Sequence, residues 1–389
     1  MSHSNSKLGS PTDIGVIRCL KKENIPIILL TSKNNDPALF SSHIHSYLTP
    51  VPEDFPNLYL RNLNAISRKY PGYVLMPTSD STLKFVSDNR DLIYKKLILP
   101  LPSKDVVDIC LKKTKTYEYA AKYNIPIPKT FIFNDIKSLI DGSKDIKYPC
   151  IIKPTINKDR KYYSKKVIQI HSSNDLISIC KKIYDYGSIP LVQEKIVGPP
   201  TNLYSLGVVF NYCNDPIAIF TGRKKRQISF DFGVGTYCES IWVPEIAEIG
   251  TRFLKSIDFV GIAQIEFKYD LQDQQYKLLE INARPWFWVS LTAACGMNLP
   301  YLLYKMATGD DEHFSGFRQD VKWQWFVGDI GLLMTQIISK HPDFSFKSCI
   351  PDFFYKRVFA TYSKSDLVPF IKEIQNSLFK FNSIMKYVV

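Results

Sequence analysis

The chain has 389 residues, more than a single hydrophobic core usually organises, so its length predicts two or three packed units. With 45% hydrophobic and 22% charged residues, the composition excludes collagen-like, low-complexity and wholly disordered proteins. The net charge of +13 comes from lysines spread along the whole chain, and no helix-turn-helix, RNP or zinc-finger spacing is present, so specific nucleic-acid binding is not expected.

Nothing in the sequence predicts insertion into a membrane. No apolar run approaches the ~18 residues that would span a bilayer. The first seven residues lack the basic and then apolar pattern of a signal peptide. We therefore expect no transmembrane segment and a cytoplasmic location.

The beginning of the chain is predicted to form a parallel α/β domain, because helical spacing alternates with short apolar runs bounded by turn formers. The expected elements are a helix at 14–22, strands at 26–31 and 73–77, a helix around 82–96 and a strand at 97–99. The second strand runs into a polar cluster at 78–81, and open parallel sheets bind their ligands at the carboxyl ends of strands. Residues 1–13 are polar, whereas a doubly wound domain usually opens with a buried strand.

The middle of the chain is predicted to contain two groups of strands. Helical spacing from 105 to 123 ends at 124–128, where two prolines forbid continuation of a helix. The elements expected next are strands at 130–133, 150–153, 166–170 and 191–194 with a helix near 173–186, and then strands near 203–210, 216–222, 261–269 and 275–282. The second group suggests an antiparallel sheet. Beyond residue 300 the pattern is mostly helical, and an aromatic-rich segment follows.

The last two strands of the second group carry acidic residues at matching positions. With a side-chain period of two, Leu278, Glu280 and Asn282 share one face of the final strand. If the polar residues before it close a hairpin near Asp273, Glu266 lies directly opposite Glu280. Like charges opposed at roughly 5 Å are destabilising unless a positive charge lies between them, and a divalent cation would supply that charge.

Glu266, Glu280 and the amide oxygen of Asn282 form an all-oxygen ligand set suited to Mg²⁺. The alternative is a solvated hairpin with ordinary acids, which a bare Glu-x-Asn pattern does not exclude. The apolar neighbours Leu279 and Ile281 indicate a buried strand, in which unpaired carboxylates need charge compensation.

Two more predicted strands end in charged residues. Lys153 ends an apolar strand and could hold a phosphate as a point charge. Glu194 ends the strand that starts at Leu191. Taken alone, each residue favours a solvated strand end.

The order in which these segments occur is the most specific feature of the sequence. The segments are Lys113, IPIP at 125–128, IIKP at 151–154, LVQEKIVG at 191–198, GIAQIEF at 261–267 and LLEINARP at 278–285. In this order and at these intervals they resemble the ATP-grasp superfamily of carboxylate-amine ligases, over roughly residues 14–310. The chain looks most like the branch that contains D-aspartate ligase, and it is more distantly similar to D-alanine:D-alanine ligase and biotin carboxylase.

The resemblance implies an α/β architecture in which the ATP-grasp part is α+β, with two lobes and antiparallel sheets. The implied domains are an N-terminal parallel α/β domain at 1–112, a small lobe or lid at 113–196, a large lobe with the metal site at 197–312 and a helical C-terminal extension at 313–389.

The resemblance also implies roles for individual residues. They are Lys113 and Lys153 for the nucleotide phosphates, Glu194 with the backbone of Lys195 and Ile196 for the adenine, Glu266, Glu280 and Asn282 for Mg²⁺ or Mn²⁺, and Arg284 for the transferred phosphate or the acyl intermediate. Arg223 and Arg226 match a basic strand that family members aim at the γ-phosphate or an acidic substrate. A solvated edge strand guarded by charge explains these two arginines equally well.

The acceptor side and the nucleotide lid are less well matched. Thr78, Ser79, Asp80 and Arg18 are the residues expected on the acceptor side, although Arg18 is better explained as a surface residue of a helix. No acid for the ribose hydroxyls follows the hinge at 198–202. The lid expected at 157–164 is polar and basic instead of glycine-rich.

The reaction implied by the resemblance couples a small-molecule carboxylate to an amine with ATP, through an acylphosphate. A homodimer is possible. Two other classes stay open at this point. A non-catalytic ATP-binding protein would retain the hinge and lose a metal ligand, and a basic nucleic-acid-binding scaffold would rest on the net charge alone.

Overall fold

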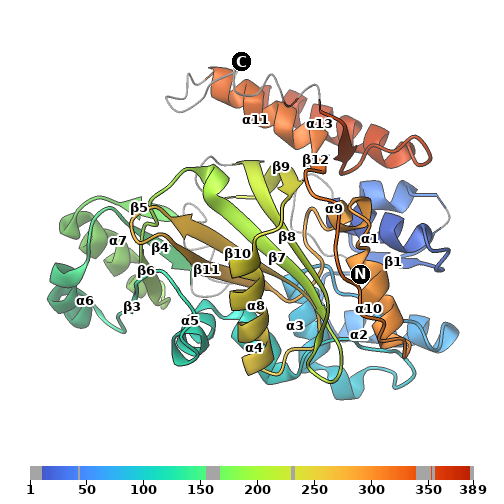
Figure 1. Cartoon of the computed structure of the whole chain (residues 1–389), viewed down its shortest axis with the longest axis horizontal. Coiled ribbons are helices and arrows are strands. Elements are labelled where there is room, and N and C mark those ends of the chain that lie inside the picture. The colour runs from blue at the N-terminus through green and yellow to red at the C-terminus, as the bar shows by residue number, and fades with distance from the viewer. Residues whose placement is uncertain are drawn as a thin grey trace.

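The computed structural model describes residues 11–42, 44–154, 167–228, 233–338, 352 and 355–385. Within these ranges the chain forms an N-terminal α/β part, a four-stranded sheet, a seven-stranded sheet and two C-terminal helices, which lie above the large sheet in Figure 1. The predicted mixed class, with helices and several antiparallel sheets, is confirmed. None of the described helices combines the length and the apolar character needed to cross a membrane.

The N-terminal part is a small parallel α/β unit. It consists of α1 (Pro11–Lys21), β1 (Ile28–Thr31), the 3₁₀ helix η1 (Pro37–Phe40), β2 (His45–Leu48), α2 (Pro56–Lys69), α3 (Asp80–Asp88) and η2 (Arg90–Leu92). β1 pairs in parallel with β2. The strands predicted at 73–77 and 97–99 are reduced to one parallel bridge. It joins Val74 to Ile98. The first segment ends in Pro77 and the second is followed by Pro100, and proline has no N–H group to extend the pairing.

Two predicted helices differ from the observed ones. The helix predicted at 82–96 is α3, which begins two residues earlier and already ends at Asp88. The helical spacing at 105–123 is divided into α4 (Lys104–Leu111) and α5 (Lys113–Lys122), because the residue between them has an extended backbone. β2 and α2 were not predicted. α2 buries only Tyr59, Leu63 and Ser67, so its apolar stripe is too narrow to stand out in the sequence.

A four-stranded antiparallel sheet follows, with the strand order β3-β6-β4-β5 (Figure 1, left). Its elements are β3 (Thr130–Ile132), α6 (Ile136–Gly142), η3 (Ser143–Asp145), β4 (Cys150–Pro154), β5 (Ile168–Ile170), α7 (Ser173–Asp185) and β6 (Pro190–Glu194). Leu176 of α7 packs with Ile152 and Val192 of the sheet. The side chains of the adjacent residues Lys153 and Gln193 therefore point to the opposite face.

The large sheet has seven strands in the order β11-β10-β7-β8-β9-β12-β13. Its strands are β7 (Leu203–Phe210), which follows η5 (Pro200–Asn202), β8 (Pro216–Gln227), β9 (Gly235–Ser240), β10 (Gly261–Asp270), β11 (Gln275–Asn282), β12 (Lys322–Gln324) and β13 (Arg357–Phe359). The helices against it are α8 (Pro244–Ser256), α9 (Ser290–Ala294) and α10 (Leu299–Ala307). A Cβ added at Gly250 of α8 would meet Leu206, and one added at Gly207 would meet Leu299 of α10. Because neighbouring strand residues point to opposite faces, α8 and α10 cover opposite faces of the sheet.

The C-terminal extension is not only helical, as the sequence predicted, but also adds two strands to the large sheet. β12 pairs with β9, and β13 pairs in parallel with β12. Strands of three residues are too short to show a period of two in the sequence. The described helices of this segment are α11 (Phe326–Ile338) and α13 (Val368–Met385). The domain boundaries expected at 112, 196 and 312 stay predictions.

Arg18 holds the C-terminal segment against the N-terminal part. Its guanidinium donates to the carbonyl oxygens of Thr361 (2.7 Å) and Asp366 (2.9 Å). It also forms an ion pair with the Asp366 carboxylate (3.3 Å). These contacts give the acceptor role predicted for Arg18 no support, and a helix position alone does not show which later segment packs against it.

A buried carboxyl group in the same region is expected to make stability depend on pH. Glu373 of α13 accepts hydrogen bonds from Trp325 Nε1 (2.5 Å) and Thr361 Oγ1 (2.5 Å). Burial raises the pKa of Glu373 to about 7, and these hydrogen bonds and the charge of Arg18 offset burial only in part.

The free energy of unfolding is expected to fall as the pH rises from 4.5 to about 7 and to level off above that. In this window the folded carboxyl of Glu373 keeps its proton, whereas the unfolded one has lost it. Glu373→Gln should remove this decline, which we expect to be on the order of 2 kcal/mol. Urea unfolding at a series of pH values, followed by circular dichroism, measures the slope. An unchanged slope in the variant would show that other groups cause it.

Candidate active site

The acidic hairpin predicted from the sequence is present. β10 and β11 pair in antiparallel fashion, and Glu266 lies directly opposite Glu280. Gln264 lies opposite Asn282, and the two amides are hydrogen-bonded (3.1 Å). Both glutamates are partly exposed, whereas the flanking Ile265 is buried. The predicted opposition of the two acids is therefore confirmed.

A β-bulge follows the paired acids and changes which side chains share a face. Phe267 pairs with Leu278, so Leu279 has no opposite residue. Leu278 consequently packs in the core with Phe267 and Ile281, while Glu280 faces the other way. The prediction that Leu278 shares a face with Glu280 is wrong, because a period of two does not reveal an extra residue. The carbonyl oxygen of Leu279 accepts a hydrogen bond from the Tyr117 hydroxyl (2.7 Å).

Lys224 of β8 supplies a positive charge to the paired acids, and the sequence did not single it out. Its Nζ lies 2.8 Å from both carboxylate oxygens of Glu266, and its side chain is only 4% exposed. Burial by itself would lower the pKa of Lys224, but the charge of Glu266, with a contribution from Glu280, outweighs burial and raises it. One lysine cation thus faces two carboxylates. The sequence signal that could have identified Lys224 is the basic run of β8. Side chains alternate between the two faces of a strand, so one set of these basic residues faces the same side as Glu266.

Arg223 lies on the face of the sheet opposite to Lys224, because the two residues are neighbours on one strand. Its guanidinium pairs with Glu239 (Nε to Oε1, 2.8 Å) and lies 6.0 Å from the centre of the Tyr204 ring. The buried Glu239 carboxylate also binds Lys322. Burial by itself would raise the pKa of Glu239, but Arg223 and Lys322 together keep it below the usual range. The structure therefore does not bring Arg223 to the paired acids.

Arg226 also points away from the hairpin. It forms ion pairs with Asp329 of α11 (2.7 Å) and with Asp352. Its guanidinium stacks 4.3 Å from the centre of the Tyr237 ring. These contacts fasten the end of β8 to the C-terminal segment, so the γ-phosphate role expected for Arg226 has no support in the geometry. A β-bulge between Lys224 and Arg226 disturbs the alternation of side chains between the two faces of the sheet.

Arg223→Gln is expected to leave the affinity for ADP with Mg²⁺ within about twofold. Arg223 belongs to a partly exposed ion pair on the face of the sheet opposite the paired acids, so its loss should have little effect on the nucleotide site. Isothermal titration calorimetry measures the affinity. A loss of tenfold or more would mean that Arg223 reaches the nucleotide after all.

Arg284 connects the acidic hairpin to the N-terminal part. Its Nη2 donates to Asn282 Oδ1 (3.1 Å), and its Nε donates to Asp80 Oδ1 (2.6 Å) at the start of α3. Of the predicted acceptor residues, Asp80 is therefore brought to the site. Ser79 instead caps α3 by accepting the N–H of Thr82 (3.2 Å).

Thr78 lies slightly apart from the hairpin. Its hydroxyl donates to Asp13 Oδ1 (2.7 Å) at the N-terminus of α1. Of the polar cluster predicted after the 73–77 segment, Asp80 thus contacts the site and Thr78 contacts α1.

The small sheet contributes Lys153, and α5 connects this lysine to the hairpin. Lys153 Nζ donates to Gln193 Oε1 (2.8 Å). Burial raises the pKa of Tyr117, Gln193 lowers it as a hydrogen-bond partner, and the charge of Glu280 adds to the increase. Tyr117 therefore lies near residues of both sheets. α5, which carries Tyr117 and contacts β11, begins at Lys113, the other predicted phosphate lysine.

The hinge segment predicted to hold the adenine joins the two sheets. Glu194 Oε1 accepts hydrogen bonds from the Lys129 N–H (2.8 Å) and from Lys277 Nζ of β11 (2.9 Å). The carbonyl oxygen of Ile196 accepts one from Lys268 Nζ of β10 (3.1 Å). These contacts place the segment at the edge of the large sheet.

Lys195 turns to the small sheet, where its Nζ donates to Gln169 Oε1 (2.8 Å). The adenine role predicted for the backbone of Lys195 stays a prediction. The lid predicted at 157–164 lies outside the described residues.

The donor set fits a hard divalent cation. Two carboxylates face each other with an amide oxygen beside them, and the charge of Lys224 neutralises only one carboxylate. Among the residues that the structure describes, no group of three or more His, Cys, Asp or Glu side chains could hold a metal ion. A cation here would therefore rely on Glu266, Glu280 and Asn282, with water or phosphate oxygens completing its shell.

No protein-family model matches the chain, but curated proteins do. D-aspartate ligase of Enterococcus faecium is 25% identical over 250 residues, which are 60% of this chain and 58% of that protein. D-alanine–D-alanine ligase B of Pseudomonas putida is 22% identical over 184 residues, which are 46% of this chain and 55% of that protein. The chain thus matches less than two thirds of the length of either relative.

Solved structures align with most of the chain. The biotin carboxylase domain of Hydrogenobacter thermophilus 2-oxoglutarate carboxylase, in complex with ADP and Mg²⁺, has a TM-score of 0.64 at 14% identity and covers 81% of this chain and 72% of its own. L-amino acid ligase from Bacillus licheniformis has a TM-score of 0.62 at 15% identity, covering 81% and 77%. The chain has the ATP-grasp fold. The similarity to the ATP-grasp superfamily, predicted from the order of its segments, is thereby confirmed.

Proposed function

We propose that this ATP-grasp chain is an ATP-dependent ligase that couples a substrate carboxylate to an amine and releases ADP. The observation that carries the proposal is the pair Glu266 and Glu280, held opposite each other beside Asn282 and Arg284. The curated relatives, which are ligases for D-aspartate and for D-alanine, support the same class of reaction.

The cofactors are ATP and Mg²⁺, for which Mn²⁺ could substitute. Lys113 and Lys153 would contact the phosphates, and Glu194 with the backbone of Lys195 and Ile196 would hold the adenine. Glu266, Glu280 and Asn282 would bind the metal ion. When bound, Mg²⁺ would neutralise the charge of the phosphates and favour transfer of the γ-phosphoryl group.

The reaction has two steps. The substrate carboxylate attacks the γ-phosphorus of ATP, which forms an acylphosphate and releases ADP. The amine then attacks the acyl carbon, loses a proton and displaces inorganic phosphate, which leaves an amide. No serine, cysteine or histidine nucleophile is needed, because catalysis is positioning and charge neutralisation.

Arg284 would stabilise the negative charge that develops on the acyl oxygen, and Asp80 would orient Arg284. Lys224 would hold the Glu266 carboxylate in the position from which it binds the metal ion. These roles follow from the contacts of the two cations with the predicted ligand set. The substrate acid and amine, the cytoplasmic location and a homodimer stay predictions.

The test is a screen of amino acids and hydroxy acids in pairs, with ATP and Mg²⁺, for release of ADP. We expect release only when a cognate acid and a cognate amine are present together. Binding of ADP with Mg²⁺ but no release with any pair would favour a non-catalytic ATP-binding protein. Binding to nucleic acid with a steep dependence on salt would instead favour the basic scaffold.

A further inference from the structure

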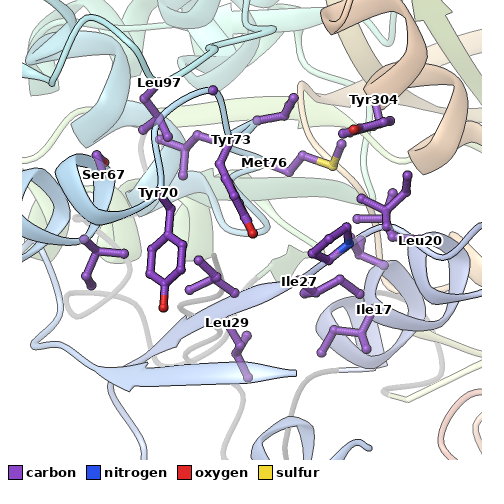
Figure 2. Close-up of a pocket in the computed structure, with 18 of the residues that line it drawn as sticks. Ile17, Leu20, Ile27, Leu29, Ser67, Tyr70, Tyr73, Met76, Leu97 and Tyr304 are labelled. Atoms are coloured by element: carbon purple, nitrogen blue, oxygen red, sulfur yellow. The ribbon is translucent and has the colours of Figure 1, made fainter. Parts of the chain in front are cut away.

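The cavity shown in Figure 2 lies in the N-terminal part and is separate from the residues predicted to hold the nucleotide. It has a volume of about 280 Å³ and lies between β1 and the segment 72–76. Its lining is mixed, with apolar residues such as Leu20 and polar ones such as Asp13 and Thr78. Lys153 and Glu194 are not among the described residues that line it. Support for nucleotide binding therefore has to come from the small sheet.

The small sheet holds Lys153 through a chain of hydrogen bonds that centres on Gln193. Lys153 Nζ donates to Gln193 Oε1 (2.8 Å), and Gln193 Nε2 donates to Thr130 Oγ1 (2.8 Å). The Thr130 hydroxyl donates in turn to the carbonyl oxygen of Pro128 (2.7 Å). A lysine can only donate, and the single hydroxyl proton of Thr130 is already used, so these partners determine which way the Gln193 amide is turned.

The surroundings of Gln193 are fastened to the acidic hairpin. The carbonyl oxygen of Pro126 accepts a hydrogen bond from the N–H of Leu278 in β11 (2.8 Å). The Tyr117 hydroxyl donates to the carbonyl oxygen of Leu279 (2.7 Å). Burial raises the pKa of Tyr117, whereas hydrogen bonding to Gln193 lowers it, so Tyr117 lies beside Gln193 as well. Gln193 is therefore connected to the strand that carries one of the paired acids.

The hydrogen bond from Lys153 ends on a neutral amide, whereas that from Lys224 ends on a carboxylate. A carboxylate cancels much of the charge of an ammonium group, but a neutral acceptor fixes the direction of the group and leaves its charge intact. Gln193 is 1% exposed and Lys153 is 9% exposed, so little water is present to screen that charge. A neutral partner therefore suits a lysine whose charge is to attract a phosphate group.

We propose that Gln193 is a positioning residue, which holds the ammonium group of Lys153 in the direction of the nucleotide phosphates without cancelling its charge. The inference rests on the proposed function, because it takes Lys153 as a ligand of the phosphates. Gln193 acts through Lys153 and not by its own contact with the nucleotide. A lysine side chain loses rotamer freedom when it binds a ligand, and one that is already held in place loses less, so the contact to Gln193 increases the affinity for the phosphates.

The test compares the affinity of the full-length protein for ADP with Mg²⁺ and for adenosine, which has no phosphate group. Gln193→Met is expected to weaken the binding of ADP roughly tenfold and to change that of adenosine by less than about twofold. In a protein that already carries Lys153→Met, adding Gln193→Met should not weaken ADP binding further, because the lysine through which Gln193 acts is gone. Isothermal titration calorimetry measures the affinity for ADP, and displacement of ADP measures that for adenosine.

The matched control is Gln324→Met, which removes a buried glutamine of β12 that donates to Asp329 (2.7 Å) and accepts from Arg357 (3.0 Å). We expect it to lower the melting temperature and to leave the affinity for ADP unchanged. If Gln193→Met bound ADP as tightly as the unsubstituted protein, the inference would be overturned and the proposed function would stand. Weakening of ADP binding that persists in full without Lys153 would also overturn it, since Gln193 would then not act through the lysine. If the unsubstituted protein bound no ADP, the proposed function would fail and the inference with it.

Discussion

Replacing Glu280 by glutamine is expected to abolish the effect of Mg²⁺ on ADP binding and to lower ADP release by roughly 10²–10³-fold. The substitution keeps the size of the side chain but removes one of the two carboxylates that face each other in the hairpin. Lys224 already neutralises Glu266, so Glu280 contributes the carboxylate charge that remains for a metal ion. Calorimetric titration of ADP with and without Mg²⁺ measures the effect even before the substrates are known.

The matched control is Glu248→Gln, which makes the same change at an exposed position of α8. We expect it to behave as the unsubstituted protein. If Glu280→Gln retained the full enhancement by Mg²⁺, the assignment of Glu266, Glu280 and Asn282 as metal ligands would be wrong. If both variants lost ADP binding altogether, the loss would reflect folding, which a thermal melt would detect.

Lys224→Met is expected to lower the free energy of unfolding by about 3–5 kcal/mol, because it leaves Glu266 without its partner in a largely buried position. The repulsion between Glu266 and Glu280 then acts without a cation between them. Mg²⁺ should recover part of the loss, since a bound cation would replace the missing charge. Urea unfolding with and without Mg²⁺ measures both effects.

Two further variants separate charge from packing at this position. Lys224→Met combined with Glu266→Gln should be more stable than Lys224→Met alone, because no unpaired carboxylate then remains at Glu266. Lys225→Met, the same change at a half-exposed neighbour on β8, should alter stability by less than about 1 kcal/mol. A double variant no more stable than the single one would mean that Lys224 acts through its packing and not through its charge.

Local rules were sufficient to predict the central strands and the acidic pair. β7 and β11 have the bounds expected from the sequence, because each is a run of residues with strong strand preference between turn formers. A hairpin predicted near Asp273 placed Glu266 opposite Glu280, and the structure has this pair, although it arises through the bulge, because the turn itself pairs Asp270 with Gln275.

The cations of the site required the tertiary structure. The run of basic residues in β8 indicated a cationic strand, but the sequence singled out Arg223 and Arg226, whereas Lys224 meets Glu266. Which residue faces the hairpin depends on the pairing of β8 with β7, and of β7 with β10, and these contacts join segments far apart in the chain. Asp80 likewise reaches Arg284 only through the packing of α3.

The sequence by itself thus indicated the fold and the two acids of the hairpin, because both depend on ordered local patterns. The tertiary structure decided which cations meet those acids and where the bulge turns Leu278 into the core. The physical reason is that hydrogen bonding and ion pairing between strands are set by neighbours in space, and a period in the sequence carries no information about them.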